Sequence, residues 1–153
     1  MCQGLSLDEY IREVRRSIEE FGWALQYVES EIDSDGIHPA FCYTVGLTDF
    51  GSPEIVVTGR GPHESSRILN ALGTSVASGM LEIEAGMGCS AAGFELFTID
   101  VPDCSDILHA ASDVYGKGRF GAVQTVWRDL EGSLPWEGIP STVVQPIFGP
   151  LPF

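Results

Sequence analysis

Two short β-rich segments separated by a tight turn constrain the fold of this chain more than any other feature. Residues 41–47 and 54–58 are rich in aromatic and β-branched side chains, which favour strands. Only a short connection containing Gly51-Ser52-Pro53 separates them. A parallel pair would need a crossover of about a dozen residues or more. The sequence therefore favours a half-open antiparallel sheet over a parallel Rossmann sheet.

Helical periodicity adds three helices to this sheet. Apolar residues recur at spacings of three and four over 7–21, 63–78 and 106–115. Ser6 and Glu9 form a capping box at the first helix, and Gly22 is placed to end it. Alternating or apolar segments at 23–28, 94–101, 120–129 and 142–148 predict further strands.

Together these elements predict one α+β domain over residues 1–153, with a mainly antiparallel sheet of five to seven strands and three helices. The length suits one domain with a packed core. A meander followed by a helix and more strands also fits a sheet curled into a small barrel, as in flavin-binding split barrels. That second form rests on topological analogy alone.

The charge of the chain limits its partners. Asp and Glu number 22 against 8 Lys and Arg, which gives a formal net charge of −14. A surface of this sign repels polyanions, so nucleic acid is an unsuitable partner, whereas a basic protein is a suitable one. The same acidity also has a simpler explanation, which is solubility.

The compartment is predicted from what the sequence lacks. No run of about 18 apolar residues is present to span a bilayer, and a charged helix replaces a signal peptide near the start. The four cysteines are widely spaced without a Cys-x-x-Cys pair. We therefore expect reduced thiols and a cytoplasmic protein.

Metal and nucleophile motifs are weak. The Glu31-x-Asp33-x-Asp35-Gly36 stretch resembles half a calcium loop, but Cys42 occupies the position of the bidentate glutamate. Three scattered histidines predict no metal site, and Cys42 within a strand is expected to be a buried hydrophobe. Residues 59–62 read Gly-Arg-Gly-Pro, yet they lack the further glycine or the Lys-Ser/Thr pair of a phosphate loop.

Polar residues embedded in strands and turns form the candidate site. We predict a pocket between the Tyr43-Thr44 strand and the 124–137 segment, lined by Tyr43, Thr44, Gln124, Asp129, Trp136 and Glu137. Gln124 lies on an apolar strand face, where it either meets a ligand or bonds a neighbouring backbone. Asp129 either forms an Asx-type turn or acts as an acid or base beside Trp136. Glu54 is either a solvated edge charge or the partner of Arg60 or Arg128.

Several motifs of the chain carry a family resemblance. They are Gly22-Trp23, Pro39-x-Phe41-x-Tyr43-Thr44-Val45-Gly46-Leu47, Pro53-Glu54-Ile55-Val56-Val57-x-Gly59, Gln124-x-Val126-Trp127-x-Asp129-x-x-Gly132-x-x-Pro135-Trp136 and Gln145-Pro146. Over residues 22–149 the chain resembles the domain of unknown function numbered 4262. This resemblance implies a bacterial origin and brings no established activity, so it assigns no catalytic residue.

Three functional hypotheses follow. The first is a domain that binds a small polar molecule in the predicted pocket, with any reaction and any cofactor left open. The second is an acidic interaction or regulatory module that meets a basic protein. The third is a flavin-binding split-barrel reductase.

Overall fold

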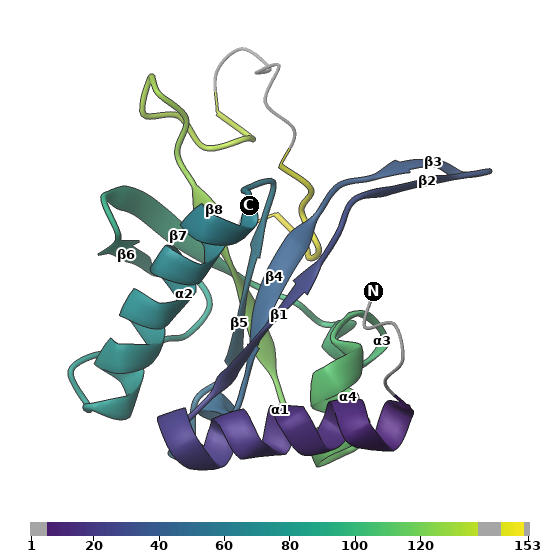
Figure 1. The fold of residues 1–153 in the computed structure, drawn as a ribbon. Coiled ribbons are helices and arrows are strands. Elements are labelled where there is room, and N and C mark those ends of the chain that lie inside the picture. The colour runs from purple at the N-terminus through teal and green to yellow at the C-terminus, as the bar shows by residue number, and fades with distance from the viewer. Residues whose placement is uncertain (1–5, 138–144, 152–153) are drawn as a thin grey trace.

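A mixed six-stranded sheet forms the centre of the fold in the computed structural model, which describes residues 6–137 and 145–151 (Figure 1). Its strands lie in the order β1-β4-β5-β8-β7-β6. Their bounds are β1 Ala24–Val28, β4 Phe41–Val45, β5 Glu54–Thr58, β6 Gly88–Ala91, β7 Phe94–Asp100 and β8 Ala122–Trp127. A separate two-stranded sheet consists of β2 (Glu31–Asp33) and β3 (Gly36–His38).

The predicted antiparallel pairing of residues 41–47 with 54–58 is confirmed. Cys42 lies opposite Val57, and Tyr43 lies opposite Val56. The α+β class is also confirmed, but β5 and β8 pair in parallel, which the sequence analysis did not predict. In the part of the chain that the structure describes, β1 and β6 are the edges of an open sheet, so the small-barrel alternative is wrong.

The helices are α1 (Leu7–Phe21), α2 (Pro62–Ala77), α3 (Cys104–Ile107) and α4 (His109–Tyr115), with a 3-10 turn η1 at Leu47–Phe50. The Ser6 hydroxyl accepts the Glu9 N–H at 3.2 Å, and Gly22 ends α1 at φ +98°, as predicted. The predicted third helix is instead split at Leu108, whose ψ of 76° is not helical. The described residues therefore contain four α-helices rather than three.

The sheet is covered on both faces, as Figure 1 shows. Ile55 and Val57 of β5 lie in the core that α2 covers. Val56 lies in the core that α1, α3 and α4 cover. Because successive strand residues point to opposite faces, this alternation builds two cores from one strand. None of the described helices is long and apolar enough to cross a membrane.

Residues 145–148 pack against the sheet beside β8. The predicted last strand, 142–148, falls partly outside the described residues, and its described part, 145–148, is not a strand. Ile147 packs instead against Ile99, Val126 and Leu134. This segment therefore contributes to the core without extending the sheet.

Gly73 of α2 packs closely against the Trp23 ring, which leaves no room for a larger residue. A Cβ at this position would lie 2.7 Å from Cε2 of the Trp23 ring, whose indole N–H bonds Asn70 at 3.0 Å. In an exposed helix, Gly→Ala adds about 1 kcal/mol of stability. Here overlap with the ring should reverse that gain, and we expect Gly73→Ala to lower the free energy of unfolding by about 1–2 kcal/mol.

Urea unfolding measures this effect, with Thr74→Ala on the exposed side of α2 as the matched control. The control should change stability by less than about 1 kcal/mol. A Gly73→Ala protein as stable as the parent would contradict close packing between Trp23 and α2.

Candidate functional site

Glu54 is a buried structural carboxylate rather than an edge charge. It is 0% exposed. Its Oε1 accepts the Thr44 hydroxyl at 2.8 Å and the Leu47 N–H at 3.1 Å. Its Oε2 accepts the Gly46 N–H at 3.2 Å and both donors of Thr48, at 2.8 Å for the N–H and 2.5 Å for the hydroxyl. The predicted arginine partners, Arg60 and Arg128, are therefore wrong, because Glu54 accepts from the Thr44 hydroxyl of β4 and from hydroxyl and backbone donors of the turn after β4.

The turn around Glu54 requires a glycine at position 46. Gly46 has φ +131°, and a Cβ there would lie 2.7 Å from the Gly22 carbonyl oxygen. Burial raises the pKa of the Glu54 carboxyl above its ordinary value of 4.5, whereas the Thr48 and Thr44 donors act in the opposite direction. The Tyr-Thr-Val-Gly-Leu and Pro-Glu motifs thus build one interlocked turn.

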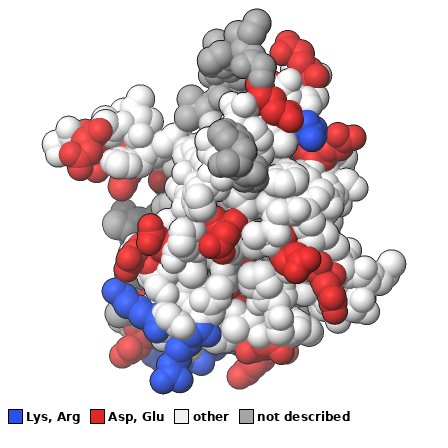
Figure 2. All heavy atoms as spheres, turned by 180° about the vertical axis from the view of Figure 1, so that it is seen from behind, with Lys and Arg blue, Asp and Glu red and all other residues white. Residues whose placement is uncertain are grey.

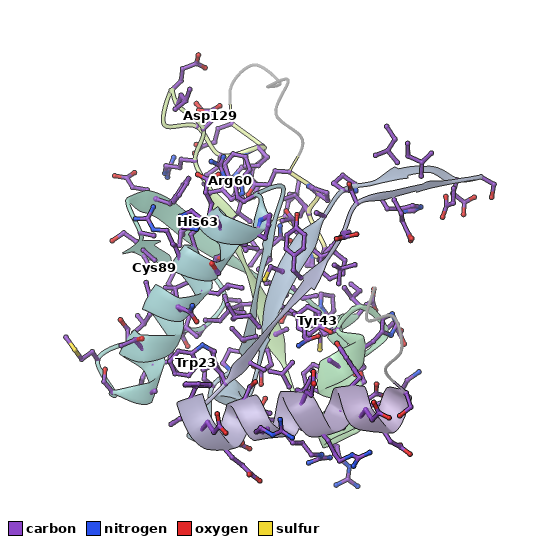
Figure 3. The ribbon with its side chains drawn as sticks, viewed as in Figure 1. Trp23, Tyr43, Arg60, His63, Cys89 and Asp129 are labelled. Carbon is purple, nitrogen blue, oxygen red and sulfur yellow. The ribbon has the colours of Figure 1, made fainter. Side chains whose placement is uncertain are left out.

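Tyr43 and Thr44 do not reach the predicted pocket. The Tyr43 hydroxyl accepts the Ala110 N–H at 2.9 Å on the α4 side of the sheet, and burial raises its pKa. The Thr44 hydroxyl bonds Glu54 and accepts the Ile55 N–H at 2.9 Å. Strand β5 also lies between β4 and β8. Figure 3 shows Tyr43 well away from Asp129, so these segments do not line one cleft.

Gln124 is fully buried, and its amide bonds neighbouring protein groups. Its Nε2 donates to the Thr58 hydroxyl at 3.1 Å and to the Pro146 carbonyl at 2.7 Å. Its Oε1 accepts the Phe148 N–H at 2.9 Å. The structural alternative for Gln124 is therefore the one observed, because this amide holds the C-terminal segment against the sheet.

Replacing Gln124 with leucine should release that segment. The change keeps the side-chain volume close but leaves the Phe148 N–H without its acceptor. It also removes one of the two donors to the Pro146 carbonyl, which keeps the Thr58 hydroxyl at 2.8 Å. Such orphaned groups cost about 1–3 kcal/mol, so we expect a loss of about 2 kcal/mol in the free energy of unfolding. Hydrogen exchange should show faster exchange at Phe148. Unchanged protection at Phe148 would contradict this role.

Gln145 also attaches the C-terminal segment to the sheet, through the backbone of Trp127 in β8. Its amide accepts the Trp127 N–H at 2.9 Å and donates to the Trp127 carbonyl at 3.0 Å, as a paired strand residue would. The Trp127 indole N–H donates to the Thr58 carbonyl at 2.8 Å. These bonds join β5, β8 and the 145–148 segment beyond the last paired residues of the two strands, Val56 and Gln124. The Gln-Pro motif and Trp127 therefore shape the end of the parallel pair.

A cleft of about 610 Å³ opens at this end of the sheet, and we call it the Arg60 cleft. It lies where the carboxyl ends of β5 and β8 meet. Figure 3 shows Arg60 and Asp129 together there. The lining residues come from the end of β5, the start of β7 and the turn after β8: Arg60, Gly93, Phe94, Glu95, Trp127, Arg128, Asp129, Leu130 and Gly132.

Arg60 is the central cation of the cleft. Its guanidinium carbon lies 4.8 Å from the centre of the Phe94 ring and 4.7 Å from that of Trp127, at cation–π distance. Its Nη2 pairs with Glu64 at 2.6 Å. Its Nε is buried and has no hydrogen-bond partner among residues 6–137 and 145–151. The guanidinium is thus held in place while one of its donors is unused.

Asp129 lines the cleft and also shapes the loop after β8. Its Oδ1 accepts the N–H groups of Glu131 and Ser133, each at 2.9 Å. The predicted Asx-type turn is therefore confirmed. Arg128 pairs with Glu137 at 3.0 Å and with Glu95 at 3.6 Å. These ion pairs brace the turn at the mouth of the cleft.

Trp136 belongs to a neighbouring surface. Its ring meets Phe97 edge-on at a centroid distance of 6.1 Å. It also lines a separate shallow cleft with Pro135, Ile147, Gly149 and Leu151. The six predicted residues are thus distributed: Asp129 lies in the Arg60 cleft, Glu137 is joined to it through Arg128, and the other four lie elsewhere.

Other reactive groups of the described chain lie outside the cleft. Burial raises the pKa of the Cys42 thiol to about 12, and its side chain is only 2% exposed, which confirms a buried hydrophobe. No group of three His, Cys, Asp or Glu residues among the described ones is arranged to hold a metal. His63, in the first turn of α2, is exposed.

Sequence reasoning missed Arg60 and Phe94 as cleft residues. Arg60 stands in the Gly-Arg-Gly-Pro stretch, which was considered as a phosphate loop, and Arg60 itself was considered as a partner of Glu54. The sequence did contain one signal for a cleft residue, namely a cationic side chain directly after a buried strand and before a helix. Phe94 lies far away in sequence, at the start of β7, so no local pattern linked the two.

Comparison with known proteins identifies one family. The family model described as Domain of unknown function (DUF4262) matches residues 17–139. Neither a curated protein nor a solved structure matches the chain.

Proposed function

The chain belongs to the DUF4262 family, and we propose that it binds a small molecule with an anionic group, such as a carboxylate or phosphate, in the Arg60 cleft. The observation that carries this proposal is Arg60 itself. Its guanidinium carbon lies 4.8 Å from the centre of the Phe94 ring and 4.7 Å from that of Trp127, and the residue lines the cleft. Its Nε is buried and has no partner in the described chain.

An unpaired buried donor favours an acceptor from outside the chain. Leaving a buried donor unsatisfied costs about 1–3 kcal/mol, and a ligand oxygen at Nε would recover part of that cost. The planar guanidinium also matches carboxylate and phosphate oxygens two at a time. Because the rings already hold the guanidinium, little side-chain freedom is lost on binding.

The position of the cleft supports the same proposal. Open sheets bind ligands beyond the carboxyl ends of parallel strands, and β5 and β8 are the parallel pair here. Arg60 directly precedes Gly61, the N-cap of α2, so it stands next to the N-terminal end of that helix. The positive end of a helix dipole favours a nearby anion.

The acidic residues of the cleft favour a ligand that carries a hydrogen-bond donor as well as an anionic group. Glu95 and Asp129 line it together with Arg60 and Arg128, so acidic and basic groups are both present. A ligand that bears a hydrogen-bond donor as well as an anionic group matches this lining better than a polyanion does. The net charge of −14 also disfavours polyanions.

A ligand panel tests the proposal. We would measure the melting temperature with simple carboxylates, inorganic phosphate, nucleoside phosphates and zwitterionic amino acids, because a ligand that binds the folded state raises it. Trp127, which lines the cleft, should change its fluorescence, and a Trp136→Phe background removes the signal of the neighbouring surface. Panels that change neither signal at saturation would contradict the proposal.

A further inference from the structure

The β2–β3 hairpin, residues 31–38, projects from the body of the molecule as an arm (Figure 1). Its two strands pair with each other and form a sheet separate from the central one. Two-stranded ribbons of this kind gain little stability by themselves. Their outer edges also leave backbone donors and acceptors available for another strand.

Two isoleucines on this arm are conspicuously exposed. Ile32 is 79% exposed and Ile37 is 72% exposed, and they lie directly opposite each other in the hairpin register. Because residues directly opposite share a face, the two side chains form one apolar pair. Single exposed apolar residues are common, but a pair at the end of a projecting arm provides an anchor for a partner.

Carboxylates flank the isoleucines along the chain of the arm. Glu29, Glu31, Asp33 and Asp35 are all exposed, and His38 bonds Asp33 at 2.9 Å. Figure 2 shows acidic side chains on the projecting arm and across the rest of this face, with most of the visible basic side chains gathered at its lower end. Arg12, Arg15 and Arg16 of α1 belong to the basic residues. Because successive strand residues point to opposite faces, Glu31 and Asp33 lie on the face opposite Ile32 and Ile37, so the arm has one apolar face and one acidic face.

We propose that the arm is a docking site for a basic protein segment in extended conformation, with lysine or arginine alternating with apolar residues. Such a segment would pair with a free edge of the arm, place apolar side chains beside Ile32 and Ile37, and direct its cations toward the carboxylates. Strand addition supplies backbone bonds, whereas the alternating side chains supply specificity. Charge complementarity is the reason to choose a basic occupant.

A second copy of this chain is a poorer occupant. Two copies each carry a net charge of −14, so they repel each other as they approach. The basic residues Arg12, Arg15 and Arg16 of α1 would favour a head-to-tail contact with the acidic arm of another copy. Self-association through the arm is therefore an outcome that the test must separate from binding of a basic partner.

The probe is a fluorescein-labelled peptide of alternating lysine and valine, titrated with the whole protein and followed by anisotropy at low and physiological salt. We expect saturable binding that weakens with salt. The double variant Ile32→Ser, Ile37→Ser should weaken binding about tenfold. The variant Glu31→Gln, Asp33→Asn, Asp35→Asn should weaken binding and flatten its salt dependence. Met80→Ser, at a residue 85% exposed outside the arm, is the matched control.

Several results would overturn the proposal. They are the absence of peptide binding, equal binding by the parent and the arm variants, and equal binding of an alternating glutamate and valine peptide. Self-association of the parent that disappears in the isoleucine variant would assign the arm to a second copy instead. Since all substituted side chains are exposed, circular dichroism should show the same fold in every variant.

Discussion

Replacing Glu54 with alanine should lower the free energy of unfolding by about 3–5 kcal/mol, the largest effect on stability that we expect from a single change. The substitution removes the acceptor of the Gly46, Leu47 and Thr48 N–H groups and of two threonine hydroxyls. These donors lie at the end of β4 and in the turn after it, around a carboxylate that is 0% exposed, so solvent does not replace the carboxylate easily. Many domains have only about 5–15 kcal/mol of stability, so part of the variant should be unfolded.

The variant Glu54→Gln separates the effect of the carboxylate charge on stability from the effect of side-chain volume. The amide keeps the volume but presents an NH₂ group to donors, and we expect it to cost about 2–3 kcal/mol. Urea unfolding and near-UV circular dichroism measure both variants, with Glu19→Gln on the exposed side of α1 as control. A Glu54→Gln protein as stable as the parent would contradict the role of the carboxylate.

The pH dependence follows from the direction of the Glu54 pKa shift. Burial raises the pKa of the folded carboxyl above its ordinary value of 4.5. Between the unfolded and folded pKa values the folded state holds the extra proton, so stability falls as pH rises through that window. Protonation of Glu54 contributes its full stabilisation of the folded state at pH values below the pKa of this carboxyl in the unfolded chain. Glu54→Gln should lack this slope, and an identical slope in both proteins would contradict the shift.

Replacing Arg60 with methionine should weaken ligand binding about 10- to 100-fold, the largest effect on function that we expect. Charged hydrogen bonds contribute about 1.5–3 kcal/mol each, and a tenfold change in Kd corresponds to about 1.4 kcal/mol. Methionine retains an apolar side chain between Phe94 and Trp127 but has no donor. Calorimetric titration of the best ligand from the panel measures the effect.

Arg60→Lys makes the test specific. Lysine keeps the charge but loses the planar guanidinium and its Nε–H, so binding should still weaken by about tenfold. Arg67→Met, at an exposed position of α2, is the control and should bind like the parent. Equal affinity in all three variants would show that the anion does not use Arg60.

Local chemistry explains what could be predicted from the sequence. The β4–β5 pairing follows from a short turn between two strand-forming segments, and the Asp129 turn follows from one side chain and its own backbone. The parallel pairing of β5 with β8 joins residues such as Val56 and Gln124, which lie far apart in the chain. No local pattern determines which distant strand enters the sheet beside β5.

The site was harder to predict for the same reason. Tyr43, Thr44 and Gln124 were recognised as polar groups in apolar strands, but their partners are Ala110, Glu54 and the C-terminal segment. A buried polar residue requires a partner, and sequence does not tell whether that partner is a ligand or the chain itself. The neighbours that make Arg60 a candidate site residue, Phe94 and Trp127, come from β7 and β8, which lie far from it in the sequence.

The most direct test of the Arg60 cleft is the nitrogen–proton NMR signal of the Arg60 Nε–H, identified by its absence in Arg60→Lys. The indole N–H signal of Trp127, which lines the same cleft, should shift as well, whereas that of Trp23, which bonds Asn70, is the internal reference. On titration with the best ligand of the panel, we predict a saturable shift of the Arg60 Nε–H signal, with slower exchange of that proton with water. Saturable binding that leaves the Arg60 Nε–H signal unchanged would contradict the assignment of this cleft as the anion site.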